Sequence, residues 1–228
     1  MLHAAQQMLA GRRLYADMFE FHPPGIFLIA DAWLRVFGLS MVSIRMLSAA
    51  SVATVALLTY LCCARVSGRP WASAALALAW AGCSQGELTQ LSHQYFTTLL
   101  SMASLLALVG GRAPAPGWAG FFAGAATMTT SGRGVLAVLA TWALLGRRWR
   151  AWPLFAVGVA VVPAACGAYL LWRGVFDAAI QDVFVWTAHR YAGIQAVPYG
   201  AGATAEDLPL VLAYPLAVLA LVALLVRR

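Results

Sequence analysis

Long apolar stretches, separated by short segments rich in Arg, Gly and Pro, make up most of the chain. Several are shorter than the roughly 20 residues that cross the hydrocarbon core of a bilayer, so we expect them to extend into less apolar flanks or to lie beside longer helices. The pattern predicts an all-α fold, a polytopic transmembrane helical bundle of about seven spans. The predicted spans are Val42–Ala64, Trp71–Gln85, Tyr95–Val109, Trp118–Thr130, Gly134–Leu145, Trp152–Trp172 and Leu208–Val226.

The composition agrees with a membrane protein. Of the 228 residues, 62% are hydrophobic and 10% are charged, whereas charged residues average about 25% in soluble domains. The net charge of +7 does not indicate a nucleic-acid partner, because the basic residues lie mostly where loops between spans are expected. The four cysteines lie in apolar runs without the spacing of metal ligands, so we expect packing roles and predict no metal site and no cofactor.

The arginines predict the orientation of the bundle. If Arg65, Arg69, Arg112, the Arg147–Arg150 cluster and the last two residues are cytoplasmic, all dense basic clusters lie on one side. This requires a turn at T-T-S-G-R-G, where Gly132 and Gly134 would supply the break. The alternative, one long tilted helix over Trp118–Leu145, would place the Arg147–Arg150 cluster outside. With the turn, the outer side holds the N-terminal region, residues 84–93, the surroundings of Arg133 and a long loop at 173–207.

The segment from Gly11 to Gly25 reads G-R-R-L-Y-A-D-M-F-E-F-H-P-P-G and concentrates charge and aromatic rings in an otherwise apolar chain. Two consecutive prolines lack backbone N–H groups and disfavour helical geometry in the residue before them, so no regular helix crosses a bilayer here. We expect the segment at a membrane surface, where its side chains can bind a phosphate and move a proton. The alternative is a solvated interfacial loop. The side chains concerned are Arg12, Arg13, Tyr15, Asp17, Glu20 and His22.

The next stretch, Pro23–Gly38, is only 16 residues long and carries Asp31 and Arg35 at a spacing that pairs them on one helix face. We interpret it as a juxtamembrane helix lying in the outer interface. The alternative is a short transmembrane helix with an internal ion pair, which would reverse the side of the N-terminus. The chain is accordingly divided into an outer-face juxtamembrane region, residues 1–41, and a transmembrane bundle, residues 42–228.

The Gly11–Gly25 run, followed twenty residues later by I-R-M-L-S-A-A-S-V-A-T-V, resembles the protein O-mannosyltransferases and their bacterial relatives that use polyprenyl-phosphate sugars, including the aminoarabinose transferases of lipid A. These are integral-membrane glycosyltransferases of the GT-C class. The resemblance covers about residues 4 to 110. His22-Pro23-Pro24 matches the family's His-Pro-Pro, Glu20 stands at the acidic position before it, and Arg45 matches the Arg that opens the next helix. A weaker match is Ser92-His93-Gln94-Tyr95, where the family often has Ser-Arg-Tyr.

The resemblance implies transfer of a sugar from a polyprenyl-phosphate donor to an acceptor on the outer face of a bacterial inner membrane. Membrane lipids are further partners, and the sugar and the acceptor are left open, as is any dependence on a metal. Cationic groups would stabilise the departing lipid phosphate while a carboxylate takes the acceptor's proton. The implied phosphate-binding residues are Arg12, Arg13, His22, Arg45, His93 and Arg133.

Two departures from the family pattern affect this expectation. The family's catalytic acidic residue lies about a dozen residues before the Gly-Arg step, which here would precede Met1, and an acidic residue after Ser-Arg-Tyr is replaced by Thr97 and Thr98. We therefore expect a fragment whose activity is uncertain, with Asp17 and Glu20 as the nearby substitutes for the base. The alternatives are a non-catalytic membrane subunit and a transporter. A transporter is disfavoured, since no internal repeat is visible and the spans hold almost no ionisable residues.

Overall fold

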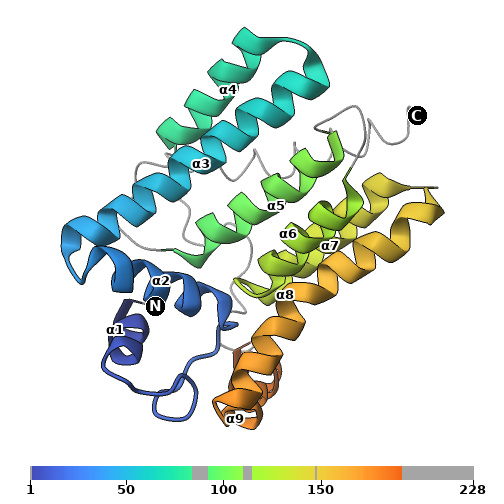
Figure 1. The fold of residues 1–228 in the computed structure, drawn as a ribbon. Helices are drawn as coiled ribbons and strands as arrows, with labels where there is room; N and C mark the ends of the chain where they lie inside the picture. The colour runs from blue at the N-terminus through green and yellow to red at the C-terminus, as the bar shows by residue number, and fades with distance from the viewer. Residues whose placement is uncertain (1, 84–91, 110–114, 147, 192–228) are drawn as a thin grey trace. The chain divides into compact units, whose positions relative to one another are not determined.

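The computed structural model describes residues 2–83, 92–109, 115–146 and 148–191 of the chain (Figure 1). It divides the chain into two compact units, Met1–Trp186 and Thr187–Arg228. Every regular element within the described ranges is a helix, which confirms the predicted all-α class. The elements are α1 (Leu2–Leu9), α2 (Gly25–Phe37), α3 (Met41–Ser67), α4 (Pro70–Cys83), α5 (His93–Val109), α6 (Pro116–Thr127), α7 (Ser131–Leu145), the 3-10 turn η2 (Trp149–Ala151), α8 (Trp152–Trp172), α9 (Phe176–Ile180) and the π-helix η3 (Gln181–Tyr191).

Helix boundaries follow local signals that the sequence contains. Ser40 precedes α3 in extended geometry, and its side chain accepts a hydrogen bond from the Ser43 N–H, so it caps the first turn. Gly68 ends α3 in the left-handed conformation that glycine adopts without strain. The predicted span Trp152–Trp172 coincides with α8, and the predicted span Tyr95–Val109 lies within α5. The seventh predicted span, Leu208–Val226, lies outside the described residues.

Two of the described helices are long and apolar enough to cross a membrane. These are α3, with 27 residues, and the continuous stretch Trp149–Trp172, with 24. The helices α4 to α7 have 12 to 17 residues each. The observed lengths therefore support membrane association.

Contacts between helices establish their relative directions. Leu47 shares a core cluster with Phe96, and the Cys62 thiol lies 3.7 Å from the Met102 carbonyl oxygen, so α3 and α5 run in the same direction. Ser104 contacts Thr141 on α7, and the Thr97 hydroxyl lies beside Thr130, so α7 runs with α5. The helix α6 runs against them. The HPP loop, residues 11–24, lies at the end of the first unit where α5 and α7 start and α6 ends, because His22 lies against His93 and Gly25 bonds Met128. This end is called here the HPP end.

A turn separates α6 from α7, as the arginine pattern predicts, and the single long helix over Trp118–Leu145 is wrong. The glycines act differently from the prediction, because the break lies at residues 128–130 and both glycines belong to α7. Gly134 is buried, and a Cβ there would overlap the backbone of Thr127, whereas a Cβ at Gly132 would meet no atom within 4 Å. Gly134 therefore permits the close approach of the two helices and does not form the turn.

Helices α6 and α8 pack through glycines. A Cβ at Gly120 or Gly124 would overlap the α8 backbone, and one at Gly158 would overlap the Gly117 carbonyl oxygen. Small residues at such contacts let helix backbones approach closely in lipid, where apolar side chains gain little from leaving the surrounding hydrocarbon. Since Gly117 lies against Leu154 and Gly124 against Val159, the two helices advance in the same direction.

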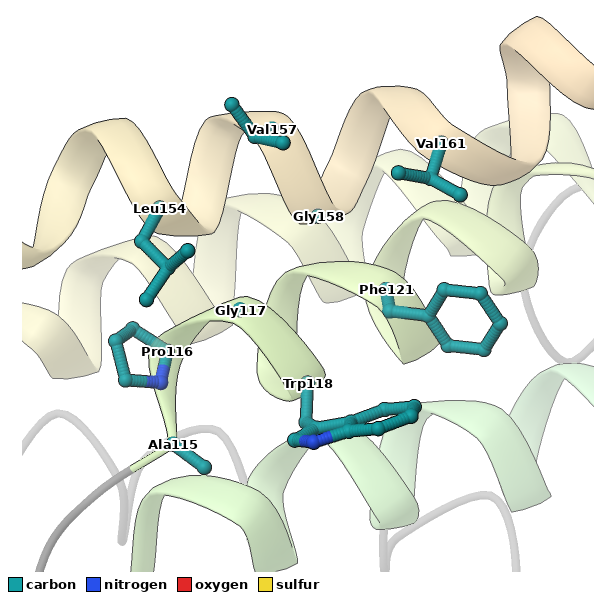
Figure 2. A pocket seen from close by; sticks show the side chains of 9 residues that line it. All are labelled: Ala115, Pro116, Gly117, Trp118, Phe121, Leu154, Val157, Gly158 and Val161. Carbon is teal, nitrogen blue, oxygen red and sulfur yellow. The ribbon is translucent and has the colours of Figure 1, made fainter.

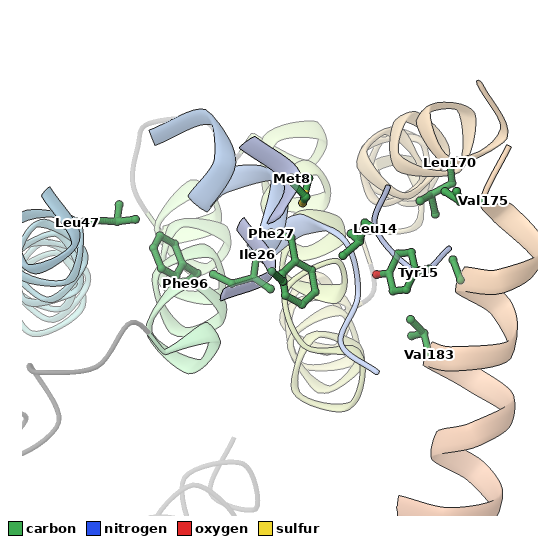
Figure 3. Close-up of a cluster of buried hydrophobic side chains, with 12 residues drawn as sticks. Met8, Leu14, Tyr15, Ile26, Phe27, Leu47, Phe96, Leu170, Val175 and Val183 are labelled. Carbon is green, nitrogen blue, oxygen red and sulfur yellow. The ribbon is translucent and has the colours of Figure 1, made fainter. Parts of the chain in front are cut away.

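The N-terminal region packs into the same compact unit as the helices that follow it. Met8 of α1 and Ile26 and Phe27 of α2 share a buried cluster with Leu47 and Phe96 (Figure 3). Ile26 and Phe27 are fully buried, so the start of α2 is anchored. The residues 1–41 thus share one core with α3 and α5.

Two expectations about flanking segments have different outcomes. The predicted pair on α2 is confirmed, since Arg35 Nε lies 2.8 Å from Asp31 Oδ2. The predicted loop at 173–207 is wrong for its first part, because α9 and η3 make residues 176–191 helical. Apolar residues recur through this stretch and bury Val175, Ala179 and Val183 against the rest of the first unit, which favours helix over loop.

Candidate functional site

A strained tyrosine organises the HPP loop. Tyr15 has a φ of 68°, in the left-handed region that side chains with a Cβ rarely adopt. It is nevertheless 5% exposed, and its hydroxyl donates a hydrogen bond of 2.7 Å to the His22 carbonyl oxygen. Burial, with smaller contributions from Glu20 and Asp182, raises the pKa of the Tyr15 phenol, so the hydroxyl stays a donor. Tyr15 therefore positions the residue that precedes the two prolines.

The glycine that ends the motif, Gly25, stands at a position that only glycine can occupy. Gly25 donates its backbone N–H to the Met128 carbonyl oxygen at 2.7 Å, which ties the start of α2 to the turn between α6 and α7. A Cβ at Gly25 would overlap that oxygen. The run H-P-P-G thus places His22 beside the α6–α7 turn, a contact between residues about a hundred positions apart in the sequence.

Asp17 and Arg13 form a surface pair on the outer part of the loop. The Arg13 backbone N–H donates to Asp17 Oδ2 at 2.7 Å, and the guanidinium lies 3.5 Å from the other carboxylate oxygen. The backbone hydrogen bond is the main reason that the pKa of Asp17 lies below its usual range. Both side chains are exposed, and so is Arg12. Asp17 is therefore a weak base that is already engaged.

Glu20 has a different environment, since it lies beside Asp182 of η3. The Glu20 backbone N–H donates to Asp182 Oδ2 at 3.4 Å. Partial burial is the main cause that raises the pKa of both carboxyl groups, and the charge of Asp182 raises that of Glu20 further. Of the two predicted catalytic carboxylates, Glu20 is thus the better proton acceptor.

The two histidines named from the sequence meet in space. The rings of His22 and His93 lie 4.4 Å apart between centroids, and each Nδ1 atom is buried without a hydrogen-bond partner among the described residues. Burial, and then the neighbouring His93, lowers the pKa of His22 to about 4. Burial, and then Arg133, lowers the pKa of His93. Both rings are neutral near pH 7 and have unused hydrogen-bonding atoms.

Arg133 belongs to the first turn of α7, a helix whose start lacks a side-chain cap. The N-cap residue Thr130 has its hydroxyl 2.8 Å from the Thr97 hydroxyl, which also lies 2.8 Å from Thr129 Oγ1 and 3.0 Å from the His93 carbonyl oxygen. These hydroxyls bond one another, so the first N–H groups of α7 keep no partner among the described residues. Uncapped N–H groups and the helix dipole favour an anion, and the Arg133 guanidinium adds a positive charge.

An apolar cavity of about 200 Å³ adjoins these polar groups. Pro23 and Pro24 of the HPP loop and Met128 of the α6–α7 turn line one side, and Cys166 and Phe176 contribute to the other. The prolines of the motif thus separate a polar region at His22 from an apolar one.

The structure does not unite all of the predicted phosphate-binding residues. His22 lies against His93, and Arg133, although exposed, is near enough to lower the pKa of His93. Among the described residues, no contact joins Arg12, Arg13 or Arg45 to this group. Arg45 lies on α3 and makes no hydrogen bond or ion pair within the described part of the chain. No group of three or more potential metal ligands occurs among the described residues.

Sequence reasoning missed three features of this end. Asp182 approaches Glu20, Trp186 packs on Phe19 and Phe21 with ring centroids 5.0 and 5.4 Å away, and Thr129 bridges to Thr97. For the third feature, the available sequence signal was the pair of hydroxyl residues Thr129-Thr130 directly after an apolar helix. Nothing local distinguishes Asp182 or Trp186, because only the tertiary fold brings them to the HPP loop.

Comparisons of the chain with protein-family models, with curated proteins and with solved structures give no match.

Proposed function

We propose that this chain is a multi-pass protein of a bacterial inner membrane that binds a polyprenyl-phosphate-linked sugar at the HPP end and transfers the sugar to an acceptor on the outer face. The observation that carries the proposal is the junction at His22. There, two histidines, Arg133 and the uncapped start of α7 adjoin the apolar cavity behind Pro23 and Pro24. This combination of a polar phosphate site next to an apolar cavity would suit a lipid phosphate.

The phosphate would be held by charge and by directed donors. Arg133 offers a permanent cation, and the N–H groups at the start of α7 point along the helix axis toward an anion. His22 and His93 are neutral in the absence of an anion, and a bound phosphate would favour their protonated, donating forms. The same groups would stabilise negative charge that develops on the phosphate as it leaves the sugar.

Glu20 would serve as the general base. Its carboxylate would take the proton of the acceptor hydroxyl while the acceptor oxygen bonds to the sugar's anomeric carbon and the bond from that carbon to the phosphate oxygen breaks. A raised pKa makes Glu20 a stronger base than an exposed carboxylate and brings it nearer to neutral pH. Asp17 is the second candidate, and its pairing with Arg13 weakens it.

The membrane assignment is supported by the surface of the helices. Large apolar side chains are exposed along α3, α4, α7 and α8, for example Trp71 at 88% and Leu136 at 65%. Contiguous exposed apolar surface of this kind indicates a membrane or a protein partner. Together with two helices long enough to span, it favours a bilayer.

Binding of a short-chain polyprenyl phosphate to the detergent-purified chain tests the phosphate site. We expect Arg133→Ala to weaken binding by about tenfold, the effect of losing one charge-assisted contact of roughly 1.4 kcal/mol. The uncharged polyprenol should bind both proteins equally. Arg69→Ala, an exposed arginine after α3, is the matched control. Equal affinities of the Arg133 and Arg69 variants for polyprenyl phosphate would contradict the proposed site.

Transfer is tested separately, with a radiolabelled sugar on polyprenyl phosphate and membranes that contain the chain. Glu20→Gln keeps the size of the side chain and removes the base, so we expect transfer to fall by about 10²–10⁴-fold with lipid binding retained. Asp17→Asn should have a much smaller effect. A larger loss in Asp17→Asn than in Glu20→Gln would move the base to Asp17.

A further inference from the structure

A second apolar groove lies between α6 and α8, with a volume of about 480 Å³. One wall is formed by Leu154, Val157 and Val161 of α8, and the other by Trp118 and Phe121 of α6 (Figure 2). Gly117 and Gly158 form its floor, because neither carries a side chain that would fill it. The groove is thus a consequence of the glycine contact between the two helices.

The groove is distinct from the HPP end. It begins at Pro116, where α6 starts, whereas the HPP loop meets residues 128–130, after α6 has ended. Figure 2 shows Leu154 over Pro116 at one extremity and Val161 near Phe121 at the other. From Leu154 to Val161 the helix rises by about 10 Å, roughly two-thirds of the thickness of one hydrocarbon leaflet.

Positive charge lies at the Pro116 extremity of the groove. Arg150 lies in the 3-10 turn η2, which leads directly into α8 four residues before Leu154 in the sequence, and Arg148 immediately precedes this turn. Both are exposed, and neither has a carboxylate partner within the described residues. The sequence contains no Asp or Glu between Glu87 and Asp177, so no acidic residue close by in the sequence neutralises the charge of these two arginines. Trp149 packs under Arg150, with the guanidinium 5.3 Å from the ring centroid, as is common where a helix enters an interface.

We propose that this groove binds an anionic phospholipid, with one acyl chain along Val157 and Val161 and the phosphate at Arg148 and Arg150. The apolar walls match an acyl chain, and the unpaired guanidiniums match a phosphate at its head. Each arginine near a lipid surface favours an anionic headgroup several-fold, so the pair selects anionic over zwitterionic lipids. The inference rests on the proposed membrane location and is independent of sugar transfer.

Native mass spectrometry of the full chain in detergent, with equal dioleoylphosphatidylglycerol and dioleoylphosphatidylcholine, tests the proposal. We expect about tenfold more retained phosphatidylglycerol than phosphatidylcholine. Val157→Trp fills the groove from a position that is already 61% exposed, so folding is preserved and bound lipid of both kinds should fall about tenfold, the loss of about two buried methylenes. Ala156→Trp, exposed on α8 outside the groove, is the matched control and should bind as the unmodified chain does.

The charge is tested by a second pair of variants. Arg148→Ala with Arg150→Ala should abolish the preference for phosphatidylglycerol and leave phosphatidylcholine binding unchanged, whereas the corresponding double Lys variant should keep the preference. The proposal is overturned if Val157→Trp retains as much lipid as Ala156→Trp, or if the preference survives removal of both arginines. Arg133→Ala should leave phosphatidylglycerol binding intact. If this variant also bound polyprenyl phosphate as tightly as the unmodified chain does, that result would contradict only the proposed function.

Discussion

The contact between α6 and α7 predicts opposite effects for two glycines that are two residues apart. A Cβ at Gly134 would overlap the Thr127 backbone and lie 2.6 Å from the Ala126 carbonyl carbon, well inside ordinary contact distance. Because the obstacle is backbone, no side chain can rotate away, and the hairpin must open. Overpacking of this kind typically costs 1–3 kcal/mol, occasionally more. At Gly132 a Cβ would meet nothing within 4 Å.

The two alanine substitutions therefore separate packing from helix propensity. Alanine stabilises a helix relative to glycine by up to about 1 kcal/mol, and this gain applies to both positions. We expect Gly132→Ala to be neutral or stabilising by up to about 1 kcal/mol and Gly134→Ala to be destabilising by about 1–3 kcal/mol. The assay is unfolding by sodium dodecyl sulfate in mixed micelles, followed by circular dichroism. Equal stability of the two variants would refute the packing of α6 against α7.

Three further predictions concern the HPP end. Tyr15→Phe leaves the His22 carbonyl without its donor and should cost about 1–2 kcal/mol in the same unfolding assay, whereas Tyr169→Phe, whose hydroxyl makes no hydrogen bond among the described residues, should cost little. Thr97→Val removes the hydroxyl that joins α5 to the α6–α7 turn and should cost about 1–3 kcal/mol, against under about 0.5 for Thr98→Val, whose hydroxyl bonds only its own helix. Because His22 has a folded pKa of about 4, below its usual 6.5, the unfolded chain takes up this proton first, so stability should fall between about pH 6.5 and pH 4. Because His22 is only about half-buried, solvent screening limits this loss of stability to about 1–2 kcal/mol. If stability depends on pH in His22→Gln as it does in the unmodified chain, the loss does not come from His22.

The helices could be predicted from sequence because each has a local cause. Apolar runs and the Pro-Pro step predict segments whose boundaries agree with the helices within a few residues, and the Ser40 cap and Gly68 explain in the structure why α3 begins and ends where it does. The turn at residues 128–130 was also predicted, from the distribution of arginines and not from a turn motif. The packing role of Gly134 was not predicted, since a glycine in a close helix contact and a glycine in a turn look alike in sequence.

The candidate site was only partly predictable for a related reason. His22 and Glu20 were named because the HPP motif is contiguous, His93 because Ser92-His93-Gln94-Tyr95 resembles the family's Ser-Arg-Tyr, and Arg133 because the predicted topology placed it on the outer side. Asp182 was assigned to a loop, although its segment is helical and brings it to Glu20. Long-range pairs of this kind depend on packing that no window of sequence contains.

The distribution of charge links the fold to the proposed orientation. The starts of α3, α5 and α7 and the ends of α6 and α8 lie at the HPP end, where all five described acidic residues are found together with basic ones: Asp17, Glu20, Asp31, Asp177 and Asp182. The opposite end carries Arg65, Arg69, Arg148 and Arg150 and no described carboxylate. In a membrane protein the positive-inside rule would place an end with only arginines on the cytoplasmic side, which agrees with the proposed outward orientation of the HPP end. The same asymmetry supports both proposals: the mixed-charge end can supply a base and a cation for transfer, whereas the arginine end can only hold an anion such as a lipid headgroup.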